Sequence, residues 1–166
     1  AACVGVPTLH AVAGSAGPSR ATVALLPAGR GELFAQLFSV ESNEDVRAID
    51  HASHLKPAEV WNKYAHLRTL TWAGPGARAH AQALKELAQS YGIPFFDQTE
   101  SALIDPVDGW ILASPCENLA AFVAAIALRE FQRGNAVGPE DLRAIYVRPS
   151  DAEINQKWPK EKPPST

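Results

Sequence analysis

The chain has 166 residues, of which 46% are apolar and 20% charged, and its formal net charge at pH 7 is −3. This composition is typical of one ordinary globular domain with a core large enough for independent folding. The slightly acidic balance argues against a broad basic face for RNA or DNA phosphates, so a role on a nucleic acid would require positive charge from a partner.

The cysteines and the longest apolar stretch indicate the cellular environment. Cys3 and Cys116 lie far apart and do not form the pattern of a disulfide-stapled secreted scaffold. The apolar stretch 119–128 is too short to cross a bilayer, and the N-terminus lacks a signal-peptide pattern. We therefore expect a soluble, cytoplasmic protein with no membrane partner. The chain has no methionine and begins with two alanines, so we expect a piece of something longer.

The first forty residues predict a short helix and then a β-hairpin. Residues 3–6 are β-prone, and Thr8 is placed to cap a short helix over 9–13. Apolar residues fill almost every position of 22–26 and 33–40, and the turn between them contains proline and glycine. Strands of this kind are typically covered on both faces, which predicts a central position in a layered fold.

The middle of the chain alternates between strand and helix signals. Residues 46–49 predict a strand that extends the hairpin sheet, and Pro57 opens a helix that continues to about Tyr64. A strand over 67–72 is followed by one helix over 77–91, whose apolar residues recur at helical spacing. The next short strand is expected at 93–96. This order of elements indicates an α/β layer built on a mixed sheet.

The last third predicts one long helix and an extended segment. Ser114 and Glu117 have the spacing of a capping box, which opens a helix that ends at Gly134. Five side chains of this helix are expected to face the core: Leu119, Phe122, Val123, Ile126 and Phe131. Residues 142–148 are expected to be extended, and the proline-rich stretch 157–166 is expected to be a loosely attached tail.

Three stretches together carry the motifs of one family. Residues 24–35 resemble a strand, then Asp-Ala-Arg-x-Gly-Glu-Val-Tyr, then a second strand, with Pro27 in place of the usual aspartate. Residues 6–13 are similar to Val-Ser-Ser-Leu-Glu-Ala-Leu-Ala, with His10 in place of the glutamate. Residues 120–148 follow a long helix, an Arg-Gly-x-x-Val-x-Pro turn and a closing Leu-Tyr-Leu-Arg strand. In this combination and order they resemble the TsaB (YeaZ) family, over nearly all of the chain.

The resemblance implies a fold and a domain division. The fold is an α/β, actin-like, ribonuclease H-like lobe, a mixed sheet flanked by helices, over residues 1–150, followed by a flexible C-terminal tail over 151–166. It corresponds to the second of two lobes in such proteins. The first lobe's Asp-Thr-Ser strand and its Gly-Pro-Gly-Ser-Phe-Thr-Gly stretch do not occur in this sequence.

The resemblance also implies a function. Members of the family act as non-catalytic scaffold subunits that bind and activate TsaD, the catalytic paralogue, in tRNA N6-threonylcarbamoyladenosine (t6A) modification of adenosine 37. It implies TsaD and TsaE as partners, tRNA only indirectly, and neither a cofactor nor a metal. The first lobe carries much of the TsaD contact in the family, so binding by this part alone is an open question.

Two short motifs are candidate sites. Gly74 and Gly76 flank Pro75 at the start of a helix, where backbone N–H groups hold phosphates in some proteins, and actin-like proteins often place a glycine-rich loop there. A simple strand-to-helix turn explains the same residues, because proline removes a donor. Arg30 and Glu32 in the hairpin turn are a candidate partner contact, and an exposed surface ion pair is the alternative.

Other reactive side chains indicate little chemistry. His51 and His54 do not have the spacing that places two imidazoles on one helix face, so a solvated turn is favoured over a metal site. Cys116 is expected in the first turn of a helix, where the dipole favours a thiolate, but no histidine is placed by sequence to act as its base. Ser114 lacks a Gly-x-Ser-x-Gly elbow. We assign no catalytic residue.

Two further interpretations remain beside the scaffold. One is an enzyme, either a hydrolase of the M22 glycoprotease type or a fragment of an actin-like-fold kinase, although no complete set of catalytic groups can be assembled from the sequence. The other is a self-associating module, a homodimer in which an apolar hairpin face pairs with a copy of itself.

Overall fold

A computed structural model of the protein describes residues 1–100, 108–145 and 147. The helices are α1 (Thr8–Ser15), α2 (Pro57–Tyr64), α3 (Pro75–Ala79), α4 (Ala81–Ser90) and α5 (Leu119–Gln132), with a 3-10 turn η1 at Pro139–Asp141. The strands are β1 (Ser19–Gly29), β2 (Glu32–Ser42), β3 (Asp45–Ala48), β4 (Ser53–Leu55), β5 (Thr69–Ala73), β6 (Phe95–Asp97) and β7 (Gly109–Leu112).

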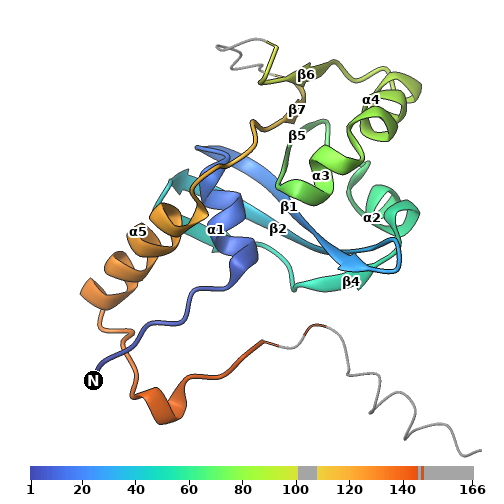
Figure 1. Ribbon diagram of the computed structural model, residues 1–166. Coiled ribbons are helices and arrows are strands. Elements are labelled where there is room, and N and C mark those ends of the chain that lie inside the picture. Colours follow the sequence, from blue (N-terminus) through green and yellow to red (C-terminus); the bar gives the residue numbers. More distant parts are fainter. Residues whose placement is uncertain (101–107, 146, 148–166) are drawn as a thin grey trace, which may run out of the picture.

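These strands form a single mixed sheet within the described residues (Figure 1). Its order is β3-β2-β1-β5-β7-β6, and β4 also pairs with β2. Strands β1, β2 and β3 are joined antiparallel, whereas β1, β5, β7 and β6 run parallel to one another. The expectation of a mixed sheet that contains the hairpin is therefore confirmed, and β1 lies where its antiparallel and parallel halves meet.

The two faces of the hairpin bury separate apolar clusters, which confirms that its strands are covered on both sides. Val23 and Leu25 point to the face that α2, α3 and α4 cover, and Ala24 and Phe38 point to the face that α1 covers. Helix α5 packs on α1 and on β3, so it forms an outer layer on that second face (Figure 1).

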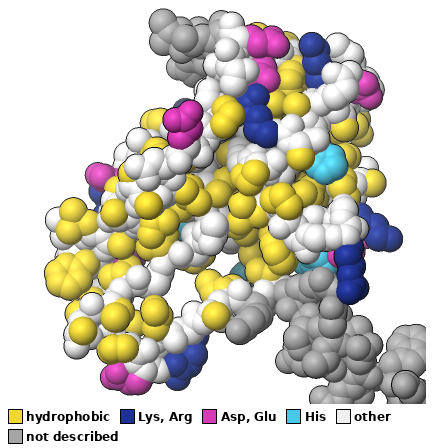
Figure 2. All heavy atoms as spheres, viewed as in Figure 1, with side chains coloured by type: hydrophobic (Ala, Val, Ile, Leu, Met, Phe, Trp, Pro, Cys, Tyr) yellow, Lys and Arg dark blue, Asp and Glu magenta, His cyan; other side chains and the backbone are white. Residues whose placement is uncertain are grey.

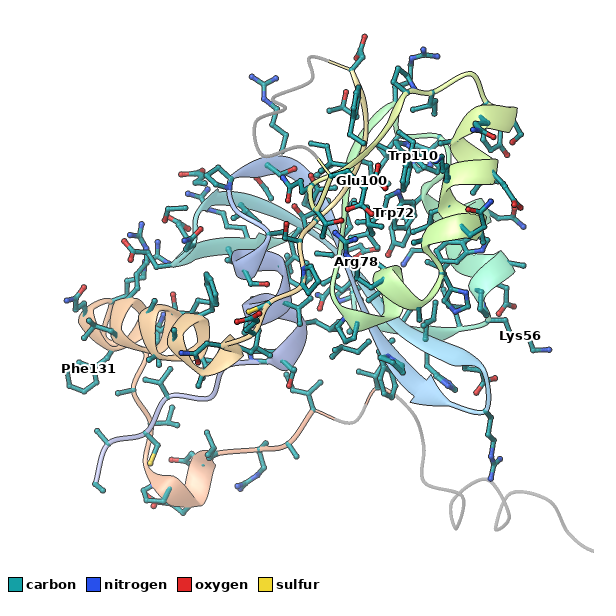
Figure 3. All side chains as sticks on the ribbon, turned by 45° about the horizontal axis from the view of Figure 1, so that its top comes forward. Lys56, Trp72, Arg78, Glu100, Trp110 and Phe131 are labelled. Atoms are coloured by element: carbon teal, nitrogen blue, oxygen red, sulfur yellow. The ribbon has the colours of Figure 1, made fainter. Side chains whose placement is uncertain are left out.

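Aromatic side chains dominate the face below α2 and α4. Trp72 of β5 and Trp110 of β7 are fully buried with ring centroids 5.2 Å apart (Figure 3). Trp61 and Tyr64 of α2 pack edge-on against Trp72. The indole N–H of Trp110 donates to the carbonyl of Leu67 at 2.8 Å. Large buried rings of this kind contribute much of the apolar area that drives folding.

Several local expectations are corrected. The helix expected over 77–91 is two helices, because His80 adopts φ −112° and ψ 18° and separates α3 from α4. Thr8 is the first helical residue rather than the cap, and Pro7 precedes it without a side-chain hydrogen bond. Residues 3–6 contribute only one bridge, between Cys3 and Val137.

Two strands and the C-terminal stretch also differ from expectation. Strands β4 and β7 were not predicted, because the sequence stretches that contain them are short and carry no alternating pattern. Leu142 is extended, with φ −68° and ψ 122°, but residues 142–145 belong to no strand, so they do not form the closing strand that the resemblance implied. The expected tail over 151–166 and its proline-rich part lie outside the described residues. Within the described part of the chain, no helix is long and apolar enough to cross a membrane.

Candidate interaction surface

Helix α5 begins four residues later than the sequence indicated. The expected capping box of Ser114 and Glu117 is wrong, because Ser114 lies in the loop that follows β7, where its N–H donates to Gln98 Oε1 at 3.2 Å. The cap is Asn118, whose side-chain oxygen accepts from the N–H of Ala121 at 3.4 Å. An asparagine in this position satisfies one of the N–H groups that a helix start leaves without partners.

The outward side of α5 is apolar apart from Gln132 at its C-terminal end. Five residues at helical spacing are exposed and carry no polar side-chain atom: Ala120, Ala121, Ala124, Leu128 and Phe131. We call this set the α5 outer face. Leu128 is 59% exposed and Phe131 54%, and Phe131 points away from the body of the molecule (Figure 3). Apolar side chains gather over this helix in the space-filling view (Figure 2).

The side of α5 next to β3 carries charged side chains. Arg129 and Arg133 both donate to Asp45 Oδ2 on β3, Arg133 at 3.2 Å. Asp45 itself is only 4% exposed. Burial raises its pKa, but Coulombic attraction from Arg129, Arg133 and Arg47 outweighs this, so the pKa of Asp45 lies below its usual value. The carboxylate is therefore charged at neutral pH and holds α5 against the sheet.

A second acid completes the inner polar layer. Glu130 accepts from Asn135 Nδ2 at 2.6 Å and from Arg133 Nη1 at 2.8 Å, and these two hydrogen bonds lower its pKa. Below the helix, burial lowers the pKa of His10 on α1, with Glu130 opposing the shift. Helix α5 thus places its charged side chains beside α1 and β3 and exposes alkyl groups on the opposite side, whereas an ordinary surface helix exposes its charged side chains.

The core face expected for this helix is corrected accordingly. Of the five side chains named from the sequence, only Ile126 is buried, at 6% exposure. Leu119, Phe122 and Val123 are partly buried, and Phe131 is exposed. The sequence could not show this, because apolar residues occupy nearly all sides of the helix.

The candidate phosphate turn lies at the carboxyl ends of β5 and β7. Residues of that turn, together with Arg78 and Cys116, line a hollow of about 390 Å³. Gly74 has φ +92°, and a Cβ there would lie 2.6 Å from the carbonyl oxygen of Leu25; at Gly76 a Cβ would lie 3.0 Å from the same residue. Close packing of α3 on β1 is thus sufficient to explain both glycines. Nucleotide binding by them stays a prediction.

The positive group in that hollow is already engaged. Arg78 donates from Nη1 to both carboxylate oxygens of Asp97 at 2.8 Å, and from Nε to the carbonyl of Ala113 at 2.8 Å. Burial raises the pKa of Asp97, but hydrogen bonds from the N–H and hydroxyl of Thr99 and from Arg78 lower it below its usual value. Arg78 therefore ties α3 to the ends of β6 and β7.

The hairpin turn places its two candidate residues differently. Arg30 has φ +52° at the tip of the turn. The Glu32 carboxylate lies 2.8 Å from Nε2 of His54, which stands on β4 beside the hairpin. A role of Arg30 and Glu32 in partner contact stays a prediction.

The remaining reactive groups do not converge. No group of three metal-binding side chains occurs among the residues that the structure describes, and His54 faces Glu32 rather than His51. The expectation for Cys116 is corrected, because this exposed thiol lies in the loop before α5 and not in its first turn.

The apolar hairpin face that suggested self-association borders a larger hollow. Leu26 and Phe34 of the hairpin line a space of about 840 Å³, which α1 and the segment 142–145 enclose from the other side. Part of the hairpin face is therefore faced by the chain itself, and the α5 outer face is the more open apolar surface.

The sheet order, with helices on both sides, defines the class of this fold, an actin-like, ribonuclease H-like lobe. Among solved structures the chain is similar to YeaZ from Pseudomonas aeruginosa, with a TM-score of 0.53 and 17% identity, over 87% of this chain and 58% of that chain. It also matches an uncharacterized protein with similarity to peptidase YeaZ from Pseudomonas aeruginosa, with a TM-score of 0.48 and 18% identity, over 86% of this chain and 57% of that one.

The structural likeness supports the sequence resemblance to the TsaB (YeaZ) family at the level of the fold. The chain spans a little over half the length of the solved YeaZ chain that it matches. No family model and no curated protein matches the sequence.

Proposed function

We propose that the chain is a non-catalytic interaction subunit of the TsaB (YeaZ) type. In this proposal it acts in the cytoplasm, binds and activates the catalytic paralogue TsaD in t6A modification of adenosine 37, and works beside TsaE. Contact with tRNA would pass through the partners, which agrees with the net charge of −3.

The observation that carries the proposal is the α5 outer face on a lobe with the YeaZ fold. A solvent-facing helix side with Leu128 and Phe131 more than half exposed is a surface of the kind that protein partners cover. The inward ion pairs of Arg129 and Arg133 with Asp45 fix this orientation. These ion pairs therefore keep the apolar side of α5 turned toward solvent.

The engagement of the charged groups also supports a binding role. Arg78 and Asp97 bond each other and the ends of two strands. Asp50 accepts from the N–H of Leu37 and from the hydroxyl of Tyr64, both at 2.8 Å. Groups bonded in this way stabilise the fold, whereas a catalytic acid or base must face a substrate.

The experiment is capture of the full chain by immobilised TsaD from the same organism, followed by t6A synthesis with TsaD, TsaE and the remaining components. Immobilised lysozyme is the control for nonspecific retention. We expect retention by TsaD alone and faster t6A formation when the chain is present. Lack of retention, or hydrolysis of a glycoprotein by the isolated chain, would contradict the proposal and favour the hydrolase interpretation.

A further inference from the structure

The larger hollow, of about 840 Å³, lies between three parts of the chain. The hairpin contributes Leu26 and Phe34, α1 contributes Leu9, and Leu142 stands on the segment that follows η1. In Figure 1 that segment runs below α1. Pockets that hold small molecules usually measure about 300–1,000 Å³ and are mostly apolar with a few polar groups. The hollow has this size and walls of this character.

The ionisable side chains in the described walls of the hollow are all basic. They are His10 on α1, His51 in the loop before β4, and Arg143. No aspartate or glutamate of the described residues lines the hollow. A wall that contains an arginine and no acid favours an anion over a cation.

His10 brings to the hollow a polar atom that has no partner within the described chain. Its Nδ1 is buried, and no described residue forms a hydrogen bond with it. The ring packs edge-on against Phe38, with centroids 4.7 Å apart, which limits its movement. Burial lowers the pKa of His10, with Glu130 opposing the shift, so the imidazole is neutral at pH 7. A neutral imidazole can donate from Nδ1, and buried polar atoms in proteins are nearly always hydrogen-bonded.

Gln36 is a second polar group in the same wall, and it is only 8% exposed. Its Nε2 donates to the backbone carbonyl of Asp50 at 2.9 Å, and this nitrogen carries a second hydrogen. The Asp50 carboxylate accepts from the N–H of Leu37 and the hydroxyl of Tyr64, and it lies 2.7 Å from Nζ of Lys63. Its charge is therefore balanced by the chain, and it repels an anion in the hollow only weakly.

We propose that this hollow binds a small apolar carboxylic acid. The carbon body of the ligand lies against Leu26 and Phe34, and its carboxylate accepts from Nδ1 of His10 and is attracted by Arg143. A single negative charge matches the single arginine in the walls. This inference goes beyond the proposed function, because it assigns a small-molecule site and requires no partner protein.

Titration of the full, isotope-labelled chain with three probes tests the proposal. The probes are naphthoate, naphthylmethanol and naphthylmethylammonium, which share a ring system and differ in charge. We expect naphthoate to bind at least about tenfold more tightly than the ammonium probe, with the alcohol between them. In nuclear magnetic resonance spectra the amide signals of Leu9, Leu26 and Phe34 should shift, whereas the signal of Phe131 on the α5 outer face should not.

Two variants with matched controls test the assigned groups. Arg143→Gln should reduce the preference for naphthoate over the ammonium probe about threefold or more, because it removes an exposed charge. Arg68→Gln, at an exposed position just before β5, should leave that preference unchanged. His10→Leu should weaken naphthoate binding about fivefold through loss of one hydrogen bond, and His66→Leu, at an exposed position after α2, should not. If circular dichroism shows that His10→Leu does not fold, the arginine pair decides alone.

Three results would overturn the proposal: equal affinity for the three probes, no binding of naphthoate, or signal shifts confined to the α5 outer face. The ligand site and the proposed function fail separately. A chain that is retained by TsaD and binds no naphthoate keeps the proposed function and refutes the ligand site. A chain that binds naphthoate in the hollow and is not retained by TsaD does the reverse.

Discussion

Helices α4 and α5 lie on opposite faces of the same sheet, and they differ in which side chains they expose to water. Helix α4 buries Leu84 and Ala88 and exposes Lys85 and Glu86, as a surface helix normally does. Helix α5 buries Ile126 and pairs Arg129 with the buried Asp45, but it exposes Leu128 and Phe131. The difference teaches that α4 is an ordinary amphipathic surface helix, whereas α5 leaves an apolar side exposed among the described residues, as a contact surface does.

The largest expected effect is the difference in stability between the same leucine-to-alanine substitution on α4 and on α5. Leu84→Ala removes a fully buried side chain and should lower the free energy of unfolding by about 2–5 kcal/mol. Leu128→Ala, at a 59% exposed position, should change it by less than about 0.5 kcal/mol. Urea denaturation measures both. Similar losses at the two positions would show that α5 is packed like α4.

The next effect concerns the ion pairs that hold α5. Asp45→Asn keeps the shape of the side chain and removes its charge, so Arg129 and Arg133 lose their shared carboxylate. We expect a loss of about 1–2 kcal/mol, measured by urea denaturation. Glu44→Gln is the control, since Glu44 is half-exposed and lies 3.6 Å from Arg129. An unchanged midpoint for Asp45→Asn would mean that these charges do not set the orientation of α5.

Acid should destabilise the fold through two aspartates, Asp45 on β3 and Asp97 on β6. The pKa values of Asp45 and Asp97 are lowered in the folded chain, so each contributes stability above its unfolded value and loses it as pH falls through the folded one. Aspartate in an unfolded chain has a pKa of about 3.9. The loss of folding stability should therefore begin below that pH. Thermal unfolding followed at decreasing pH should show a shallower decline for Asp45→Asn than for the wild type. An equal decline would contradict the assignment.

The smallest effect tests where α5 begins. Asn118→Ala removes the side chain that caps the helix and should cost about 0.5–1 kcal/mol. Ser114→Ala should have almost no effect, because Ser114 donates to Gln98 through its backbone N–H only. Thermal unfolding of the two variants distinguishes them, and a larger loss at Ser114 would restore the capping box that the sequence suggested.

The sequence was sufficient for the parts of the fold whose pattern has one physical solution. The two hairpin strands are apolar on both faces, and only a central position in a sheet covers both. The start of α2 at Pro57 was also predictable, because proline fits the first turn of a helix and almost no other helical position. Both features depend on residues that are close together in the sequence, so the sequence alone predicts them.

The sequence was not sufficient where the outcome depends on a distant partner. The inward turn of Arg129 is set by Asp45, which lies more than eighty positions earlier in the chain and has no pattern that announces the pair. The break at His80 was hidden because the apolar spacing continues across it. The packing role of Gly74 and Gly76 likewise depends on Leu25. Such contacts join residues that are distant in the sequence, so a local pattern does not reveal them.

Hydrogen–deuterium exchange of the full chain with and without added TsaD tests the account most directly. If the α5 outer face is a contact surface for TsaD, peptides from Leu119–Gln132 should exchange more slowly when TsaD is added, while peptides from Ala81–Ser90 keep the same rate. Exchange in α5 that added TsaD does not slow would contradict the assignment of this face to protein contact.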